Sequence, residues 1–255
     1  MPAMADPAHV PNCLISLRPT GQHDTLRRAA ARRGWGLVAV SPWRLQARSD
    51  PATRFALATA LAAPVVVFTS PMAVRAAAQL APLSASAGAR QWLAVGEGTA
   101  RALRRVGVAP VQAPTRMDSE GLLALPVLAA AERVGLVTAP GGRGLIATTL
   151  QQRGARVDRA DVYERVPLLL PASILARLRA LPPPAVLAVS SAEAFDRVLA
   201  QLPADLLAQW RRDPVVVASA RLGQLARERG FARIVPADGP RPAQLLAALD
   251  HLGGD

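Results

Sequence analysis

The stretch VGLVTAPGGRGLIATTLQQRGARVDRADVYERV, residues 134–166, decides how this chain folds. It opens with an apolar run at 134–138 that is typical of a buried strand. After a Pro-Gly-Gly-Arg-Gly turn, residues 145–153 carry apolar side chains at helical spacing, and Gly154 suits a left-handed helix end. Residues 155–163 predict a second strand. The stretch is therefore a strand–helix–strand unit, which predicts parallel strands.

The turn at residues 139–144 is the first candidate binding loop. Gly141, Gly142 and Arg143 lie directly before the predicted helix, where backbone N–H groups and a guanidinium can face an anion. The spacing matches neither GxGxxG nor GxxxxGKS/T, so the two common nucleotide-binding fingerprints are absent. An ordinary tight turn is the alternative interpretation of these glycines.

The rest of the chain alternates apolar strands with helices. Further strands are predicted at residues 13–18, 36–41, 64–68, 92–95, 185–189, 215–218 and 233–236. Further helices are predicted at residues 22–33, 51–62, 71–80, 118–130, 171–180, 192–201, 204–211, 220–229 and 242–252, with another that ends at residue 106. Such alternation predicts an α/β fold with doubly wound parallel sheets.

The two halves of the sequence resemble each other. VFTS at 67–70 lies 121 positions before AVSS at 188–191, and LAVG at 93–96 lies 123 positions before VVAS at 216–219. Two more matches at these offsets are LLA at 122–124 and 245–247, and Pro-x-Gly at 19–21 and 140–142. The chain is therefore predicted to contain two similar α/β units, each of roughly 120 residues.

Small polar residues and arginines gather where the predicted strands end. They are Arg18, Thr69, Ser70, Gly96, Thr99, Ser190, Ser191, Ser219 and Arg221. Open α/β sheets bind ligands at the carboxyl ends of their strands, so these residues and the 139–144 loop are candidate substrate-binding residues. For each serine or threonine alone, a helix N-cap is an alternative role.

Composition argues against several classes of protein. The 255 residues are 51% hydrophobic, but no apolar run approaches the roughly 18 residues of a membrane span. The first residues lack a signal-peptide pattern and Cys13 is the only cysteine, so we expect a cytoplasmic protein without an internal disulfide. No cluster of cysteine and histidine predicts a metal site. His9, His23 and His251 are interpreted as surface residues.

The charge of the chain predicts an anionic partner. All 30 basic residues are arginines, and the net charge is +12. A GC-rich genome explains much of the arginine, but such a surplus still attracts anions, either nucleic acid or a small polycarboxylate. The absence of a long basic run and an aromatic content of 4% argue against a stacking platform for single strands.

Five segments together carry a family resemblance. They are VFTSPMAVRAA (67–77), WLAVGEGTARALRRVGV (92–108), SEGLLALPVL (119–128), APGGRGLIATTLQQRGARVDRADVYERV (139–166) and VVVASARLGQLARERGF (215–231). In order and spacing the chain resembles uroporphyrinogen-III synthases from about residue 13 to residue 250. The resemblance implies two similar α/β domains interleaved in sequence, residues 1–43 with 168–255 and residues 44–167. It also implies two linker segments, near residues 42–44 and 166–170, and a mobile active-site cleft between the domains.

The resemblance further implies an enzyme, a cyclising hydro-lyase of haem biosynthesis. Its substrate is hydroxymethylbilane, a linear tetrapyrrole with eight carboxylates. The last pyrrole ring is inverted, water is lost, and the macrocycle closes as uroporphyrinogen III. An arginine-rich cleft suits such a polyanion, and neither a metal nor an organic cofactor is implied. We expect a monomer that binds no nucleic acid or membrane and contacts the enzyme of the preceding step transiently.

Carried onto this chain, the resemblance implies that Tyr163, the only tyrosine, is the general acid near the leaving hydroxyl, although packing is an alternative role. Thr99 matches the threonine of a Gly-x-x-Thr turn. Substrate-lining positions are matched by Thr69, Ser70, Gly142, Arg143, Ser190, Ser191 and Ser219. Residues 219–222, Ser-Ala-Arg-Leu, depart from members that have threonines there. A catalytically silent binding or regulatory homologue therefore stays an alternative, and a nucleic-acid-binding protein is a second one.

Overall fold

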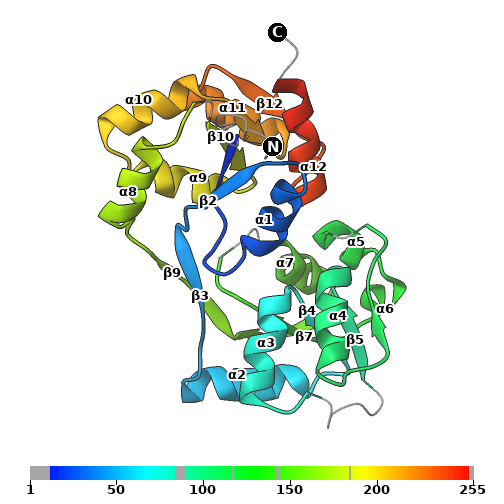
Figure 1. The fold of residues 1–255 in the computed structure, drawn as a ribbon. Helices are drawn as coiled ribbons and strands as arrows, with labels where there is room; N and C mark the ends of the chain where they lie inside the picture. Colours follow the sequence, from blue (N-terminus) through cyan, green and yellow to red (C-terminus); the bar gives the residue numbers. More distant parts are fainter. Residues whose placement is uncertain (1–11, 84–89, 117, 142–143, 184, 253–255) are drawn as a thin grey trace, which may run out of the picture. The chain divides into compact units, whose positions relative to one another are not determined.

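The chain divides into two compact units. The computed structural model describes residues 12–83, 90–116, 118–141, 144–183 and 185–252. Unit 1 comprises residues 1–44 and 167–255, and unit 2 comprises residues 45–166. In Figure 1, unit 1 combines the blue N-terminal part of the ribbon with the yellow-green to red C-terminal part, and unit 2 runs from light blue to green.

Unit 1 contains a five-stranded parallel sheet. Its strands, in spatial order, are β12 (Ile234–Pro236), β11 (Val215–Val217), β10 (Ala185–Val189), β1 (Cys13–Ser16) and β2 (Gly36–Ala39). Cys13 at the start of β1 pairs with Gly36 on one side and Ala185 on the other. The N-terminal strands and the C-terminal strands therefore share one sheet, which requires the interleaved chain path.

Unit 2 contains a second five-stranded parallel sheet with the same topology. Its strands, in spatial order, are β6 (Val111–Gln112), β5 (Gln91–Ala94), β4 (Val65–Phe68), β7 (Arg133–Thr138) and β8 (Arg156–Asp161). Strands β10, β11, β12, β1 and β2 thus correspond one by one to β4, β5, β6, β7 and β8. The predicted pair of similar parallel α/β domains is confirmed, and the internal sequence repeat has a topological basis.

Helices connect the strands of each sheet, and in unit 1 two more helical segments follow the last strand. Those of unit 1 are α1 (Asp24–Ala31), α8 (Ala172–Arg179), α9 (Ala192–Leu199), α10 (Ala204–Arg212), α11 (Ala220–Glu228), α12 (Pro242–Ala247) and the 3-10 helix η2 (Ala248–Leu252). Those of unit 2 are α2 (Pro51–Leu61), α3 (Pro71–Leu80), α4 (Glu97–Arg105), α5 (Ser119–Leu123), α6 (Pro126–Ala129) and α7 (Leu145–Gln152). Together they supply the apolar faces that cover the sheets.

The central strand β4 shows why its sequence is an uninterrupted apolar run. Successive side chains of a strand point to opposite faces of the sheet. Val66 and Phe68 belong to one buried cluster, whereas Val65 and Val67 belong to another. Both faces of β4 are therefore covered, as is usual in parallel sheets, and no polar alternation is expected.

The predicted strand at 155–163 is in fact two strands. β8 ends at Asp161, and Tyr163 begins β9 (Tyr163–Pro167), which pairs with β3 (Trp43–Ala47) in a separate two-stranded sheet. Val162 lies between the two strands, and its N–H donates to Thr138 O of β7 at 3.0 Å. The two linker segments are therefore strands of one small sheet, which the sequence did not predict.

The predicted helix at 118–130 is also interrupted. α5 ends at Leu123, and α6 begins at Pro126. A proline has no N–H to donate to the preceding turn and is favoured at the first position of a helix, so it starts a new helix here. The short strand β6 was not predicted from its two residues.

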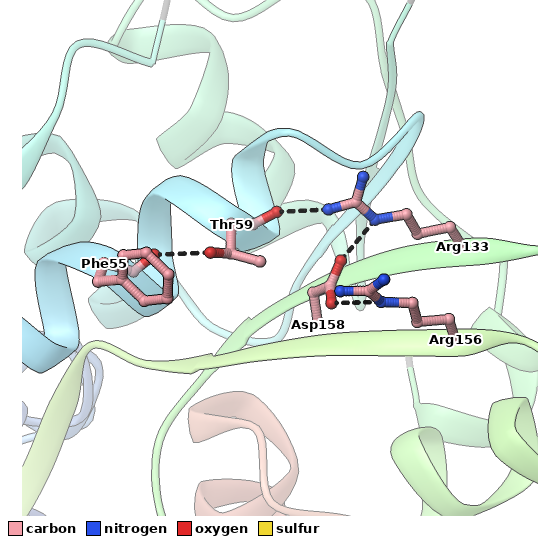
Figure 2. Close-up of polar contacts among 5 residues, drawn as sticks. All are labelled: Phe55, Thr59, Arg133, Arg156 and Asp158. Atoms are coloured by element: carbon pink, nitrogen blue, oxygen red, sulfur yellow. Dashed lines mark hydrogen bonds and ion pairs between the residues drawn. The ribbon is translucent and has the colours of Figure 1, made fainter.

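Helix α2 packs closely on β7 at Gly135. A Cβ atom at this position would lie 1.9 Å from the carbonyl oxygen of Ala60. Beside this contact, Asp158 of β8 accepts hydrogen bonds from Arg133 Nε at 2.6 Å and from Arg156 Nε at 3.0 Å. Figure 2 shows the carboxylate between the two guanidinium groups. Arg133 also donates to the Thr59 carbonyl at 3.3 Å, so one network joins α2, β7 and β8.

Replacing Asp158 by asparagine should lower the free energy of unfolding by about 1–2 kcal/mol at neutral pH. The reason is that Arg133 and Arg156 both lose their negatively charged partner, a carboxylate that is only 8% exposed. Burial alone would raise the pKa of Asp158, but the hydrogen bonds from Arg133 and Arg156 hold it below its ordinary value. The stabilisation is therefore present above the ordinary pKa and is lost as the pH falls through the lowered one.

Urea unfolding of the Asp158→Asn protein at several pH values measures this effect. Asp161→Asn is a matched control on the same strand, since Asp161 is more exposed and, among the described residues, bonds to a single arginine, Arg159, at 3.0 Å. The control should lose less stability. A deficit in Asp158→Asn that stays constant on acidification would contradict the electrostatic explanation.

Candidate functional site

The strand order of each sheet reverses at one point, which defines the candidate site. In unit 2 the reversal lies between β4 and β7, and in unit 1 it lies between β10 and β1. Ligands of open α/β sheets bind outside the carboxyl ends of strands at such a switch point. The residues that follow these four strands are therefore the candidate ligand-binding residues of each unit.

In unit 2, two threonines meet at the switch point. Thr69 follows β4, and Thr138 ends β7. Thr69 Oγ1 donates to Thr138 Oγ1 over 2.8 Å, and Thr69 N–H donates to Val137 O over 3.2 Å. The pair presents hydroxyl groups at the carboxyl edge of the sheet. Thr69 was a predicted site residue, whereas Thr138 ends the predicted strand 134–138, directly before the candidate binding loop.

Ser70 and Tyr163 form a second polar pair in unit 2. The Ser70 Oγ atom lies 3.1 Å from Tyr163 Oη, and it also accepts the N–H of Ala73 over 3.0 Å as the N-cap of α3. The tyrosine is only 9% exposed, and its ring packs in the buried cluster of unit 2. Its hydroxyl is thus held by a fixed neighbour at the strand end.

The other predicted residues of unit 2 lie at loop and helix starts. Gly96 is the N-cap of α4, and its carbonyl accepts the N–H of Thr99, which is 4% exposed. Gly141 has a φ of +88°, a conformation that glycine adopts without strain. Gly142 and Arg143 lie outside the described residues.

In unit 1, serines begin two helices at the carboxyl edge of the sheet. Ser191 Oγ accepts the N–H of Ala194 at 3.3 Å at the start of α9, and Ser219 Oγ accepts the N–H of Leu222 at 3.4 Å at the start of α11. The N-cap interpretation is therefore correct for Ser70, Ser191 and Ser219. Each capping hydroxyl keeps its own hydrogen for another acceptor.

Three further predicted residues of unit 1 differ in exposure. Ser190 and Arg221 are exposed, and within the described ranges neither side chain forms a hydrogen bond. Arg18 follows β1 at the switch point and is half-buried, with its Nη2 donating to Pro240 O over 3.0 Å. Burial lowers the pKa of Arg18 from its ordinary value. No hydrogen bond joins these three side chains in the part of the chain that the structure describes.

The interpretation of His23 as a surface residue is wrong. Its imidazole is 5% exposed and lies among polar groups of unit 1. His251 is exposed as predicted, and His9 lies outside the described residues. No sequence motif marks the burial of His23, because its partners come from two other segments of the chain.

The described residues contain neither a metal-ligating cluster nor a membrane-spanning helix. No three histidine, cysteine, aspartate or glutamate side chains are grouped there so that they could hold a metal ion. Within the same residues, no helix has the length and apolar character needed to cross a membrane.

The comparison with known families settles the relationship of this chain. Residues 16–247 match the family model described as uroporphyrinogen-III synthase HemD. The chain belongs to the uroporphyrinogen-III synthase family. All candidate site residues lie within the matched range, so they are part of the synthase-like region in both units.

Two named synthases support this assignment. The chain is 34% identical to uroporphyrinogen-III synthase of Salmonella typhimurium over 165 residues, 63% of this chain and 67% of that protein. It is 33% identical to uroporphyrinogen-III synthase of Escherichia coli over 162 residues, 62% of this chain and 66% of that protein.

A solved structure of a family member shares the fold. A mutant uroporphyrinogen III synthase from the extremely thermophilic bacterium Thermus thermophilus superposes with a TM-score of 0.62 over 94% of this chain and 98% of that chain, at 18% identity. At this identity the likeness concerns the fold, and it agrees with two parallel α/β sheets.

Proposed function

We propose that the chain catalyses the uroporphyrinogen-III synthase reaction, in which hydroxymethylbilane loses water, its last pyrrole ring is inverted, and the macrocycle closes. The observation that carries this proposal is the family match over residues 16–247. Relatives that are 33–41% identical and named as this enzyme support it.

The reaction needs one proton delivered and one removed. The hydroxyl group takes up a proton and leaves as water. A carbon–carbon bond then forms between the exposed methylene carbon and the substituted α carbon of the last pyrrole ring. The older bond from this ring carbon to the neighbouring methylene breaks, that methylene bonds to the opposite, unsubstituted α carbon of the same ring, and this carbon loses its proton. Because pyrroles are electron rich, the leaving hydroxyl needs only modest acid assistance. Holding the linear substrate so that closure follows inversion is the larger task for the protein.

Tyr163 is our proposed proton donor. Ser70 Oγ already accepts the N–H of Ala73, so its own hydrogen can be donated across the 3.1 Å contact to Tyr163 Oη. The phenol hydrogen is then directed to a third partner, which we assign to the leaving hydroxyl. The packing of the ring in the buried cluster restricts its rotation and keeps the hydroxyl at the strand end.

The eight carboxylates of the substrate require cationic and hydrogen-bonding partners. We assign this role to the helix N-termini capped by Ser70, Ser191 and Ser219, where backbone N–H groups attract anions. Arg18 and Arg221 add guanidinium groups, which bind carboxylates with charge-assisted hydrogen bonds. The net charge of +12 supports a polyanionic substrate in general terms.

Hydroxymethylbilane consumption by the purified chain tests this function. We expect saturable turnover without added metal or cofactor. Binding without turnover would instead indicate a silent tetrapyrrole-binding homologue, as the 219–222 loop suggested. Retention on DNA that falls steeply with salt, without any turnover, would favour the nucleic-acid alternative. A cytoplasmic location, action as a monomer and contact with the enzyme that supplies the substrate stay predictions.

A further inference from the structure

His23 forms a buried polar bridge in unit 1. Its Nδ1 atom lies 3.0 Å from Ser16 Oγ, and its Nε2 atom lies 2.9 Å from Ser41 Oγ. Ser16 ends β1 and is completely buried, whereas Ser41 follows β2. The ring therefore connects the carboxyl ends of two neighbouring strands, and both of its nitrogen atoms are occupied.

The bridge closes the loop that carries Arg18. Residues 17–23 run from the end of β1 to the start of α1, and His23 occupies the N-cap position of α1. Its side chain makes no capping hydrogen bond, since the ring is used for the two serines instead. Thr20 N–H also donates to Trp43 O over 3.1 Å. The loop is thus fixed at both ends and once in its middle.

The imidazole is kept neutral in this position. Burial lowers the pKa of His23 to about 4, and the positive charges of Arg27 and Arg18 act in the same direction. Asp24 and a hydrogen bond with the Arg18 backbone oppose the shift. A neutral ring offers one N–H donor and one acceptor, which two serine hydroxyls can both satisfy. The ring therefore bridges the serines without adding a charge next to Arg18.

We propose that His23 is a positioning residue, whose imidazole between Ser16 and Ser41 holds the 17–23 loop so that Arg18 can bind a carboxylate of the substrate. One of the five guanidinium N–H groups of Arg18 is used toward Pro240 O, and the other four make no hydrogen bond to the residues that the structure describes, so they can serve a ligand. The inference rests on the proposed function, because it takes hydroxymethylbilane as the anion that Arg18 binds.

Steady-state kinetics with hydroxymethylbilane tests the proposal through single and double variants. His23→Leu should raise KM about tenfold with little change in kcat, since a misplaced Arg18 loses a charge-assisted contact made in both ground and transition states. Arg18→Ala should raise KM by a similar factor. The double variant should be no worse than Arg18→Ala alone, because both changes remove the same interaction.

Conservative variants separate positioning from general damage to the fold. In His23→Asn the amide replaces Nδ1 and can keep the Ser16 contact, and in His23→Gln it replaces Nε2 and can keep the Ser41 contact. At least one of these two variants should have a KM close to the wild-type value. If His23→Leu does not fold, Ser41→Ala provides the same test, because it removes only one contact at a half-buried position.

The outcomes distinguish the inference from the proposed function. If Arg18→Ala leaves KM unchanged, the substrate-binding role of Arg18 fails. If Arg18→Ala raises KM but His23→Leu does not, or if the two effects multiply in the double variant, His23 does not act through Arg18 and the positioning role is overturned.

The acid dependence of stability gives an independent measurement of the bridge. The folded-state pKa of His23, about 4, lies below its ordinary value of 6.5, so the stabilisation by the neutral ring is complete above pH 6.5 and is lost as the pH falls toward 4. The urea midpoint of the wild-type protein should therefore fall more steeply across this range than that of His23→Leu. Parallel curves would show that the ring is not held neutral in the folded state.

Discussion

Tyr163→Phe is expected to lower kcat about 100-fold without abolishing turnover, and to leave KM nearly unchanged. General acid assistance contributes roughly 10²–10⁴-fold, and the lower end applies because an electron-rich pyrrole expels the hydroxyl readily. The phenyl ring keeps its packing in unit 2, and only the hydroxyl next to Ser70 is lost. Rapid-quench or steady-state kinetics with hydroxymethylbilane measures the effect.

Ser70→Ala serves as the companion variant. It removes the hydrogen-bond partner of Tyr163 and the N-cap of α3, but the tyrosine keeps its proton. A smaller loss of kcat is expected, with a loss of stability of about 1 kcal/mol from the missing cap. If Tyr163→Phe retains the full kcat, the tyrosine is a packing residue and the acid lies elsewhere.

Gly135→Ala is expected to produce the largest loss of stability, about 3 kcal/mol or more, or a protein that does not fold. A Cβ atom at this position would lie 1.9 Å from Ala60 O and 2.7 Å from its carbonyl carbon. Both are backbone atoms, so α2 itself must move away from β7. Overpacking typically costs about 1–3 kcal/mol, and a clash with rigid backbone belongs at or above the upper end.

Gly223→Ala is the matched control for this glycine substitution. The nearest atoms to its added Cβ would be Val217 Cγ2 at 3.6 Å and Ile234 Cγ2 at 3.9 Å, which are ordinary contacts. Inside α11, alanine is favoured over glycine by about 1 kcal/mol, so the control should be neutral or slightly stabilised. Equal urea midpoints for the two variants would contradict the close approach of α2 to β7.

The repeat and the apolar runs were sufficient to predict the two sheets, apart from the short edge strand β6. Residues 67–70 and 188–191 span the carboxyl ends of corresponding strands, β4 and β10, because the same local pattern builds the same topology twice. The linker strands β3 and β9 escaped prediction, since neither is an apolar run. Such strands depend on each other rather than on their own sequence pattern.

The candidate site could be predicted only in part. Thr69 and Ser70 were identifiable because they directly follow a buried strand. The Ser70–Tyr163 contact joins residues 93 positions apart, and the Asp158 network joins two strands to α2, so neither follows from local spacing. His23 was misassigned for the same reason, because burial of a lone histidine depends on partners in other segments.

The isomer composition of the product tests the central claim most directly. Hydroxymethylbilane that closes without inversion gives the I isomer, whereas inversion of the last ring gives the III isomer. Chromatographic separation of the two after reaction with the purified chain should show predominantly uroporphyrinogen III, in a proportion that rises with enzyme concentration. Product that remains the I isomer at every enzyme concentration would contradict the account.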